Sequence, residues 1–491
     1  MVAALWLLAP TSMYADGGKR EFRGAWMQFV NGMYLGKSTA EIQQMLTYQL
    51  DELEKDGANA IIFQVRGECD ALYESKIEPW SRYLTGVQGK APSPYWDPMA
   101  WMIQQCHRRG MEFHAWINPY RARMKSPTRL ADNHILKTHP ERAFEYGGLY
   151  VLNPGLKENR DYILSVVDDI VSRYDIDGIH IDDYFYPYPE GGRPIPDDRE
   201  YALYNNGIAD RGDWRRYNVN LFVKEMGEHV HKLKPWVKFG VSPFGIYRNK
   251  KSSPIGSDTN GLQNYDQLYA DVLLWVNNGW IDYCVPQLYW HIGHPLADYE
   301  KLIKWWAKHM ANRPLYIGES IENTVQNSDP ANPNTHQMAA KFRLHRQLRN
   351  VSGTVLWYAK VAAEDMGSYG TMLRNVYWKS KALPPYMPFL DSKAPKKPAK
   401  MGDAWTEDGL MLYWSAPKAK KWGDEARRYV IYRFAKGEKV NLTDASKIVK
   451  ITYDNYYRLP YDGGTKKYKY VVTALDRVGN ESKGAKRKVK L

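Results

Sequence analysis

The stretch Asp177–Pro187 reads D-G-I-H-I-D-D-Y-F-Y-P, a short strand pattern that ends in two adjacent acids. Ile179 and Ile181 belong to one face of such a strand, because successive side chains point to opposite faces of a sheet. We expect this face to pack against helices. The opposite face, which should point to the interior of a closed sheet, carries His180, Asp182 and Tyr184.

Short apolar segments like this one alternate with amphipathic helical segments from Glu21 onward. Eight such strands separated by helices predict a (β/α)8 TIM barrel. The strands are expected at Phe22–Phe29, Asn59–Arg66, Met111–Asn118, Asp177–Asp183, Val237–Pro243, Ile281–Tyr289, Pro314–Ser320 and Gly353–Tyr358.

A second part of the chain begins where the periodicity changes to two. We divide the sequence into a leader (residues 1–20), a barrel (21–390), a linker (391–400) and a small all-β domain (401–491). The linker, D-S-K-A-P-K-K-P-A-K, is rich in proline and lysine and should be semi-rigid. The last part resembles a fibronectin type III sandwich, with Trp414 on an early strand and Tyr468 and Tyr470 on a later one.

The net charge is +13 and the isoelectric point is near 9.2. Much of this excess lies in the C-terminal fifth, which favours a solvated basic face and leaves attraction to an anionic polymer open. The basic residues are not interleaved with a nucleic-acid motif, so no nucleic-acid partner is expected. Cys69, Cys106 and Cys284 are scattered without metal-ligand spacing, and we expect no metal and no cofactor.

The N-terminus, M-V-A-A-L-W-L-L-A-P-T-S-M-Y-A-D, resembles the apolar core of a signal peptide. It is too short to span a bilayer, and no other segment is apolar enough to do so. No cysteine lies nearby to carry a lipid, so lipid anchoring is not supported. The sequence therefore predicts an exported protein of the periplasm or cell envelope.

Polar and aromatic side chains follow every predicted strand, where a TIM barrel builds its active site. Trp116, Trp290 and Trp357 are candidate platforms for stacking a sugar ring, although each could equally belong to a core. The other candidate binding residues are Arg66, Asp70, Tyr73, Asn118, Tyr120, Arg121, His180, Tyr184, Ser242, Gln287 and Tyr289.

Two carboxyl groups are the usual requirement for glycoside cleavage, one to protonate the leaving oxygen and one to act as nucleophile or base. Asp182 is the first candidate, and Asp183 and Glu319 are candidates for the second role. Alternation along the seventh strand does not settle where Glu319 points, and Glu68 and Asp70 also stay open. Substrate-assisted cleavage is disfavoured, because His180 and Tyr184 stand where chitinase-like enzymes carry acids.

A set of motifs resembles the glycosyl-hydrolase-like family ten of bacteria over roughly Glu21 to Ser380. The motifs are F-R-G-A-W, F-Q-V-R-x-x-x-D-A-L-Y, E-P-W-S-x-Y-L-T-G, H-A-W-I-N-P-Y-R, L-N-P-G, D-G-I-H-I-D-D-Y-F-Y-P, G-V-S-P-F-G-I-Y-R-N and D-Y-C-V-P-Q-L-Y-W. The resemblance implies an exported barrel hydrolase, and one branch of the family hydrolyses peptidoglycan strands that lack stem peptides, at the division site. It supports Asp182, Asp183 and most of the binding candidates, adds Asn153, and does not support Glu319.

We therefore expect an exported glycoside hydrolase that cleaves a glycan polymer, most concretely peptide-free peptidoglycan strands, by carboxylate acid/base catalysis. Two alternatives stay open. One is a non-catalytic glycan-binding protein on a degenerate barrel, and the other is a hydrolase of another polysaccharide. Product analysis separates the enzymes from the binding protein, and substrate choice separates the two hydrolases.

Overall fold

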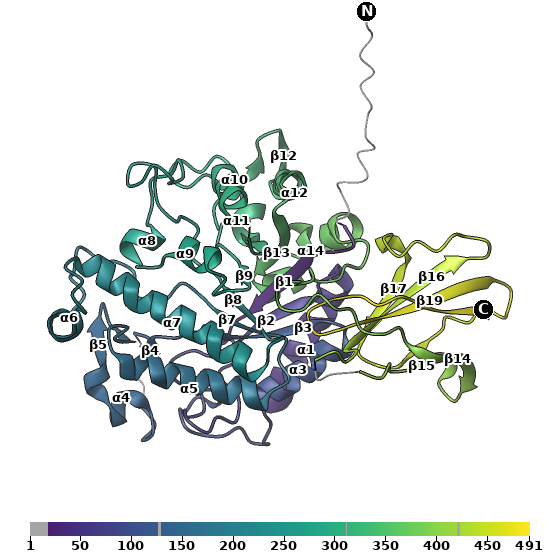
Figure 1. Ribbon diagram of the computed structural model, residues 1–491, viewed down its shortest axis with the longest axis horizontal. Coiled ribbons are helices and arrows are strands. Elements are labelled where there is room, and N and C mark those ends of the chain that lie inside the picture. The colour runs from purple at the N-terminus through teal and green to yellow at the C-terminus, as the bar shows by residue number, and fades with distance from the viewer. Residues whose placement is uncertain (1–17, 126–128, 311, 420–422) are drawn as a thin grey trace, which may run out of the picture.

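The computed structural model describes residues 18–125, 129–310, 312–419 and 423–491, and in them a closed barrel of eight parallel strands is surrounded by helices (Figure 1). Each predicted strand overlaps one barrel strand, so the predicted (β/α)8 fold is confirmed. The predicted leader, residues 1–20, lies outside the described residues except for its last three. In chain order the barrel strands are β1 (Phe22–Met27), β2 (Ala60–Arg66), β3 (Glu112–Ile117), β7 (Gly178–Ile181), β8 (Lys238–Val241), β9 (Tyr283–Cys284), β10 (Leu315–Ser320) and β13 (Val351–Trp357).

The longer helices of the outer layer are α1 (Thr39–Asp56), α3 (Pro98–Arg108), α5 (Lys157–Arg173), α7 (Arg211–Leu233), α10 (Tyr299–His309) and α12 (Met338–Gln347). Local sequence sets their ends: at α1, Ser38 and Glu41 form a reciprocal capping box, and Gly57 ends the helix with a φ of 94°. Shorter helices are α2 (Arg82–Thr85), α4 (Ile135–Thr138), α6 (Asp198–Tyr204), α8 (Asn264–Gln267), α9 (Val272–Asn277), α11 (Ile321–Val325), α13 (Ala359–Ala363) and α14 (Tyr369–Met372). No helix in the described ranges is long and apolar enough to cross a membrane.

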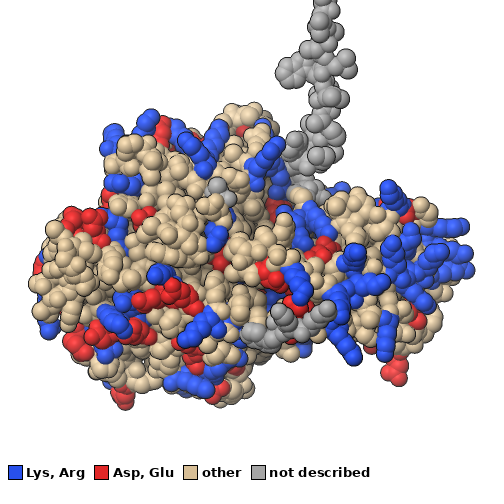
Figure 2. Space-filling view, viewed as in Figure 1, with Lys and Arg blue, Asp and Glu red and all other residues tan. Residues whose placement is uncertain are grey.

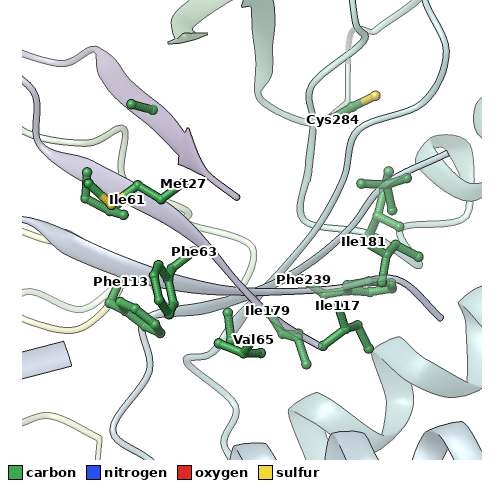
Figure 3. Close-up of a cluster of buried hydrophobic side chains, with 14 of the residues drawn as sticks. Met27, Ile61, Phe63, Val65, Phe113, Ile117, Ile179, Ile181, Phe239 and Cys284 are labelled. Carbon is green, nitrogen blue, oxygen red and sulfur yellow. The ribbon is translucent and has the colours of Figure 1, made fainter. Parts of the chain in front are cut away.

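Strand alternation divides the barrel core into two layers. Side chains that point outward, Ile179 and Ile181 among them, pack with the helices in the larger cluster (Figure 3). Side chains that point inward form a smaller cluster that includes Phe22, Trp26 and Tyr283. The predicted orientation of the fourth barrel strand is therefore correct. Asp182, which directly follows β7, lies at the C-terminal end of the barrel interior.

Two small sheets interrupt the barrel pattern. The loop after β3 forms an antiparallel sheet of β4 (Arg121–Arg123), β6 (Leu149–Leu152) and β5 (Ala143–Tyr146). A hairpin of β11 (Ser328–Asp329) and β12 (Asn332–His336) follows α11. Because it follows a barrel strand, the β4–β6–β5 sheet extends the rim where the polar strand ends meet.

Two antiparallel sheets form the C-terminal part, as the period-two pattern predicts. One contains β14 (Ala399–Thr406), β15 (Gly409–Ser415) and β18 (Tyr456–Arg458), and the other contains β17 (Ile448–Thr452), β16 (Arg428–Ala435), β19 (Lys467–Leu475) and β20 (Ala485–Lys490). Trp414 and Tyr470 lie buried between the sheets. Residues 391–398 form no helix or strand, and the likeness to fibronectin type III stays a prediction.

The four-stranded sheet packs against the N-terminal ends of the barrel strands, opposite the polar rim. Arg428 Nη2 donates to Glu112 Oε1 at 2.7 Å, and Lys238 Nζ donates to the same carboxylate at 2.6 Å. All three residues are buried. Burial opposes ionisation, but the charges of Lys238 and Arg428 lower the pKa of Glu112 to about 2. The C-terminal part is thus joined to the barrel through a buried ionic contact.

Candidate active site

A cavity of about 290 Å³ opens at the C-terminal ends of the barrel strands. Eight loops meet at this rim, which is where TIM-barrel enzymes place their chemistry. The structure brings together nine of the predicted site residues in the cavity lining: Trp116, Asp182, Asp183, Tyr184, Ser242, Gln287, Tyr289, Trp290 and Trp357.

Asp182 is held by two donors from the end of β3. Its Oδ2 atom accepts hydrogen bonds from Trp116 Nε1, at 3.2 Å, and from Asn118 Nδ2. The amide of Asn118 cannot be reversed, because its Oδ1 atom already accepts from Gln64 Nε2 at 2.7 Å and from Arg121 Nη2. The other carboxyl oxygen of Asp182, Oδ1, is buried without a hydrogen-bond partner among the described residues. One oxygen is therefore fixed by the end of β3, and the other is buried with no hydrogen bond from the described residues.

Asp183 lines the same cavity and is held by a different pair of donors. Tyr188 donates its hydroxyl to Asp183 Oδ2, and Gln287 Nε2 donates to Oδ1 at 3.0 Å. Gln287 also donates to the carbonyl of Ser242 at 2.9 Å, which fixes the amide. Among the lining residues the two aspartates are the carboxylates. The cavity thus contains an acid pair from consecutive residues.

The pKa values of both acids are raised above that of ordinary aspartate. Burial raises the pKa of Asp182 to about 7, against the lowering effect of the Arg121 guanidinium, and the charge on Asp183 adds to the rise. Burial also raises the pKa of Asp183, while the hydrogen bonds from Tyr188 and Gln287 oppose the rise. An acid with a pKa near neutrality holds a proton that it can transfer at physiological pH.

His180 lies below the cavity floor. Its Nδ1 atom is 3.1 Å from Tyr283 Oη, and its Nε2 atom is 3.1 Å from Ser242 Oγ. Burial lowers the pKa of His180 well below its ordinary value, so the ring stays neutral. His180 therefore positions Ser242 and does not itself line the cavity.

Aromatic rings form the cavity walls. Tyr289 stacks on Trp357, with centroids 5.9 Å apart, and Phe244 meets Trp290 edge to face at 5.4 Å. Trp357, Tyr289 and Trp290 are partly exposed, whereas Trp116 is buried. Trp290 and Trp357 are thus the tryptophans with ring surface open to a ligand, and Trp116 acts by donating to Asp182.

A second cavity of about 250 Å³ adjoins the first. Tyr184 and Tyr188 line both, and the β4–β6–β5 sheet supplies a further wall that includes Tyr146. Arg121 brings positive charge to this wall, where Lys125 forms an ion pair with Glu190 at 3.4 Å. The rim therefore offers an extended, aromatic surface rather than a single pocket.

The model of a family described as "Glycosyl hydrolase-like 10" matches residues 21–334, which include the whole acid pair and its donors. The chain belongs to this family. Membership confirms the predicted enzyme class, glycoside hydrolase, and the resemblance seen in the motifs.

Named relatives agree with this assignment. "Glycosyl hydrolase YngK" of Bacillus subtilis (strain 168) is 39% identical over 96% of this chain and 94% of its own length. "Glycosyl hydrolase DigH" of Escherichia coli (strain K12) is 37% identical over 64% of this chain and 75% of its own. Among solved structures, the PgaB (BpsB) glycoside hydrolase domain from Bordetella bronchiseptica covers 71% of this chain and 98% of its own, at 11% identity and a TM-score of 0.46. This similarity is too low to support the fold assignment, which rests on the strand order of the barrel itself.

Glu319 lies outside the cavity of this hydrolase. It shares the outward face of β10 with Ile317, which packs in the barrel–helix layer. Its carboxylate accepts from Lys341 Nζ at 2.5 Å, from Thr324 Oγ1 at 2.5 Å and from Tyr299 Oη at 2.9 Å. The Glu319 carboxylate therefore points toward the helices and forms a buried ion pair with Lys341. It does not reach the cavity that contains Asp182.

Several other predicted residues also lie outside the cavity of the hydrolase. One of them, Arg66, fixes the strand end that carries the donors to Asp182. Arg66 forms a buried two-pronged ion pair with Glu78 and donates to the carbonyls of Asn118 and Pro119. This pairing fixes the end of β3, which carries the donors to Asp182. Further buried residues that do not line the cavity are Asp70, Tyr73, Tyr120 and Asn153.

Three lining residues of the hydrolase were not among the sequence candidates: Trp26, Tyr188 and Phe244. A signal existed for each. Trp26 is near the end of β1 on its inward face, Phe244 directly follows the S-P that ends the fifth predicted strand, and Tyr188 follows the acid pair by a few residues. No group of three or more metal-binding side chains occurs within the residues that the structure describes.

Proposed function

We propose that this hydrolase cleaves β-linked, N-acetylated glycan strands, most concretely peptidoglycan strands from which the stem peptides have been removed. The observation that carries the proposal is the acid pair Asp182–Asp183 at the base of an aromatic cavity. The family supports glycosidic chemistry, and the resemblance of the motifs supports the choice of polymer.

We assign the general acid to Asp182. Burial raises its pKa to about 7, so it holds a proton near neutrality that it can give to the oxygen of the leaving sugar. Its Oδ1 atom has no hydrogen bond from the described residues to compete for that proton. Asp183 is the second carboxylate at the reacting centre, held by Tyr188 and Gln287. In this assignment Asp183 supplies the negative charge that an oxocarbenium-like transition state requires.

The second cavity supports a polymeric substrate. A chain bound over the acid pair can continue past Tyr184 and Tyr188 to the β4–β6–β5 sheet, where ring faces are available to further sugars. Arg121 there would attract the lactyl carboxylates of a peptide-free strand. Stem peptides would replace these carboxylates by amides, which is the chemical basis proposed for the preference.

The proposed substrate lies outside the cytoplasmic membrane, and we accordingly propose export, with residues 1–20 as the leader. Residues 21–390 are the proposed catalytic unit. Residues 391–400 connect it to the β-domain (401–491), which we propose to be fibronectin type III-like. Its contact with the barrel through Arg428 and Glu112, at the start of β3, supports a role for this domain outside the chemistry.

Product analysis tests the proposed function. The purified protein is incubated with peptide-free peptidoglycan strands, with intact peptidoglycan and with amylose, and products are identified by mass spectrometry. New reducing-end fragments from the peptide-free strands alone are expected. Binding without release would favour a non-catalytic glycan-binding protein, and cleavage of amylose alone would favour another polysaccharide.

The activity should follow a bell-shaped pH profile. Asp182 must be protonated to act as an acid, so kcat/KM should fall about tenfold per pH unit above its pKa of about 7. Asp183 must be ionised, so activity should also fall on the acid side, with an apparent pKa above the ordinary 3.8. Rates measured from pH 4 to 9 check this, and an activity that is flat from pH 6 to 9 would remove Asp182 from the acid role.

Truncation of Trp290 should weaken substrate binding more than it slows the chemistry. Loss of a stacking ring removes roughly 1.5–3 kcal/mol of apolar contact, so Trp290→Ala should raise KM by roughly ten- to a hundredfold and leave kcat within about threefold. The matched control is Trp405→Ala, on the C-terminal sheet and 62% exposed, which should change neither constant. An unchanged KM for Trp290→Ala would show that the ring does not hold sugar.

A further inference from the structure

The outer face of the C-terminal four-stranded sheet carries a dense group of lysines. We define the lysine face as Lys436, Lys467, Lys469, Lys486, Lys488 and Lys490, the first following β16 and the others on β19 and β20. Figure 2 shows basic side chains crowded at this end of the molecule, with few acidic ones between them. Five of the six are exposed, and Lys469 is half-buried.

The pairing of β19 with β20 places several of these lysines directly opposite one another. Across β19 and β20, Lys467 pairs directly with Lys490, and Lys469 pairs with Lys488. Directly opposed side chains in an antiparallel pair lie about 5 Å apart, and like charges there are destabilising. Alternate residues along β20 add a row of lysines spaced by about 7 Å.

The nearby carboxylates do not neutralise these charges. Glu438 pairs with Lys447 at 2.5 Å, and Asp462 pairs with Lys466 at 3.3 Å. Among the described residues the lysine face forms no ion pair, and Lys469 donates to the carbonyl of Glu438. The two opposed lysine pairs therefore have no counter-charge from the described residues.

A hollow of about 560 Å³ lies within the face. Lysines from both strands line it, together with Lys436 and Gly437. Arg487 does not contribute, because alternation turns it to the other side of the sheet, where it pairs with Asp403. The hollow is therefore a concave, lysine-lined track along two paired strands.

We propose that the lysine face binds a linear polymer with phosphodiester groups in its backbone. Lysine ammonium groups bind phosphate as compact point charges, and this face consists of such groups, without the fixed two-pronged geometry of arginine. Two rows of separate charges suit a chain with repeated anions better than a single small ion. None of the exposed large apolar side chains in the described residues belongs to this face, so it lacks an anchor for lipid.

The site is independent of the catalytic cavity. It lies at the end of β19 away from Leu475, whose partner in β16 is Arg428 at the barrel contact. Binding there leaves the rim of the barrel uncovered. A bound polymer would hold the hydrolase in place while the cavity acts on a different strand.

The test measures binding of the full-length protein to synthetic poly(glycerol phosphate) by isothermal titration calorimetry at 50 and 200 mM salt. The variant Lys467→Gln/Lys488→Gln/Lys490→Gln should bind at least about tenfold more weakly, and its slope of log affinity against log salt should be smaller by about 2–3. The variant relieves both opposed lysine pairs, so its thermal stability should be equal to or above that of the unchanged protein.

A matched control removes the same charge elsewhere. The exposed lysines of the barrel in Lys37→Gln/Lys90→Gln/Lys308→Gln lie outside the face, so this variant should keep the affinity. Equal affinity of the two triple variants would overturn the proposal. Equally tight binding of polyglutamate would also overturn it, because the face would then bind any polyanion. So would equally tight binding of phosphatidylglycerol vesicles, because the face would then bind a membrane surface.

Discussion

Replacing Asp182 by Asn should lower kcat for hydrolysis of peptide-free strands by about 10³-fold or more, within the range expected for loss of a positioned acid. The amide keeps the shape of the side chain and can still accept from Trp116 and Asn118, but it has no proton to give to the leaving oxygen. Strand binding should persist. Mass spectrometry of products and calorimetry with the same strands measure the two effects separately.

The same variant should be more stable than the unchanged protein at alkaline pH. The folded-state pKa of Asp182, about 7, exceeds its ordinary value of 3.8, so the folded state binds a proton that the unfolded state releases. Stability therefore falls as pH rises between these two values and stays reduced above pH 7, at about 1.4 kcal/mol per pKa unit for an isolated group. Asn cannot ionise and escapes this loss.

Two results would contradict the assignment of Asp182. Retention of more than a tenth of kcat would show that another group protonates the leaving oxygen. Equal denaturant midpoints for Asp182→Asn and the unchanged protein at pH 8 would show that folding does not raise the pKa of the Asp182 carboxyl group.

Replacing Glu319 by Gln should act on stability and leave the chemistry intact. The exposed fractions of the Lys341 and Glu319 side chains are 2% and 1%, so the variant leaves a buried ammonium without its counter-ion. Breaking a buried pair in this way costs about 3–5 kcal/mol. Urea unfolding monitored by circular dichroism measures the loss, and kcat per folded molecule should stay within about twofold at 20 °C.

A second substitution should rescue Glu319→Gln. Combining it with Lys341→Met removes the unpaired charge and restores apolar contact, so the double variant should recover most of the lost free energy of unfolding. A large fall in kcat for folded Glu319→Gln would instead return this residue to the reaction.

The inward direction of Asp182 was predictable from sequence, because the isoleucines of β7 mark the outward face without ambiguity. Glu319 was not predictable in this way. Its strand presents a glycine and a tyrosine on one side, and only the packing of Ile317 among the helices shows which side is outward. Its ionic partner, Lys341, comes from α12, and single-sequence patterns carry no information on such long-range pairing.

The arginine at the end of β2 illustrates the same limit. Arg66 stands at a strand end where a binding residue is expected. In the structure it forms a buried ion pair with Glu78 of the following loop and does not line the cavity. The second carboxylate shows the reverse. Strand alternation alone would turn Asp183 away from Asp182. However, β7 ends at Ile181, and both acids line the cavity.

The buried contact between Arg428 and Glu112 also bears on how such a chain can evolve. A proline-rich connection suggests a detachable module that recombination could exchange freely. Here the barrel ends in charged groups, Glu112 and Lys238, that are shielded by the C-terminal sheet. A descendant that lost the sheet would lose the hydrogen bond from Arg428 to Glu112 and would expose Leu383, which packs with the apolar side chains of the sheet, so the two parts are not independent modules.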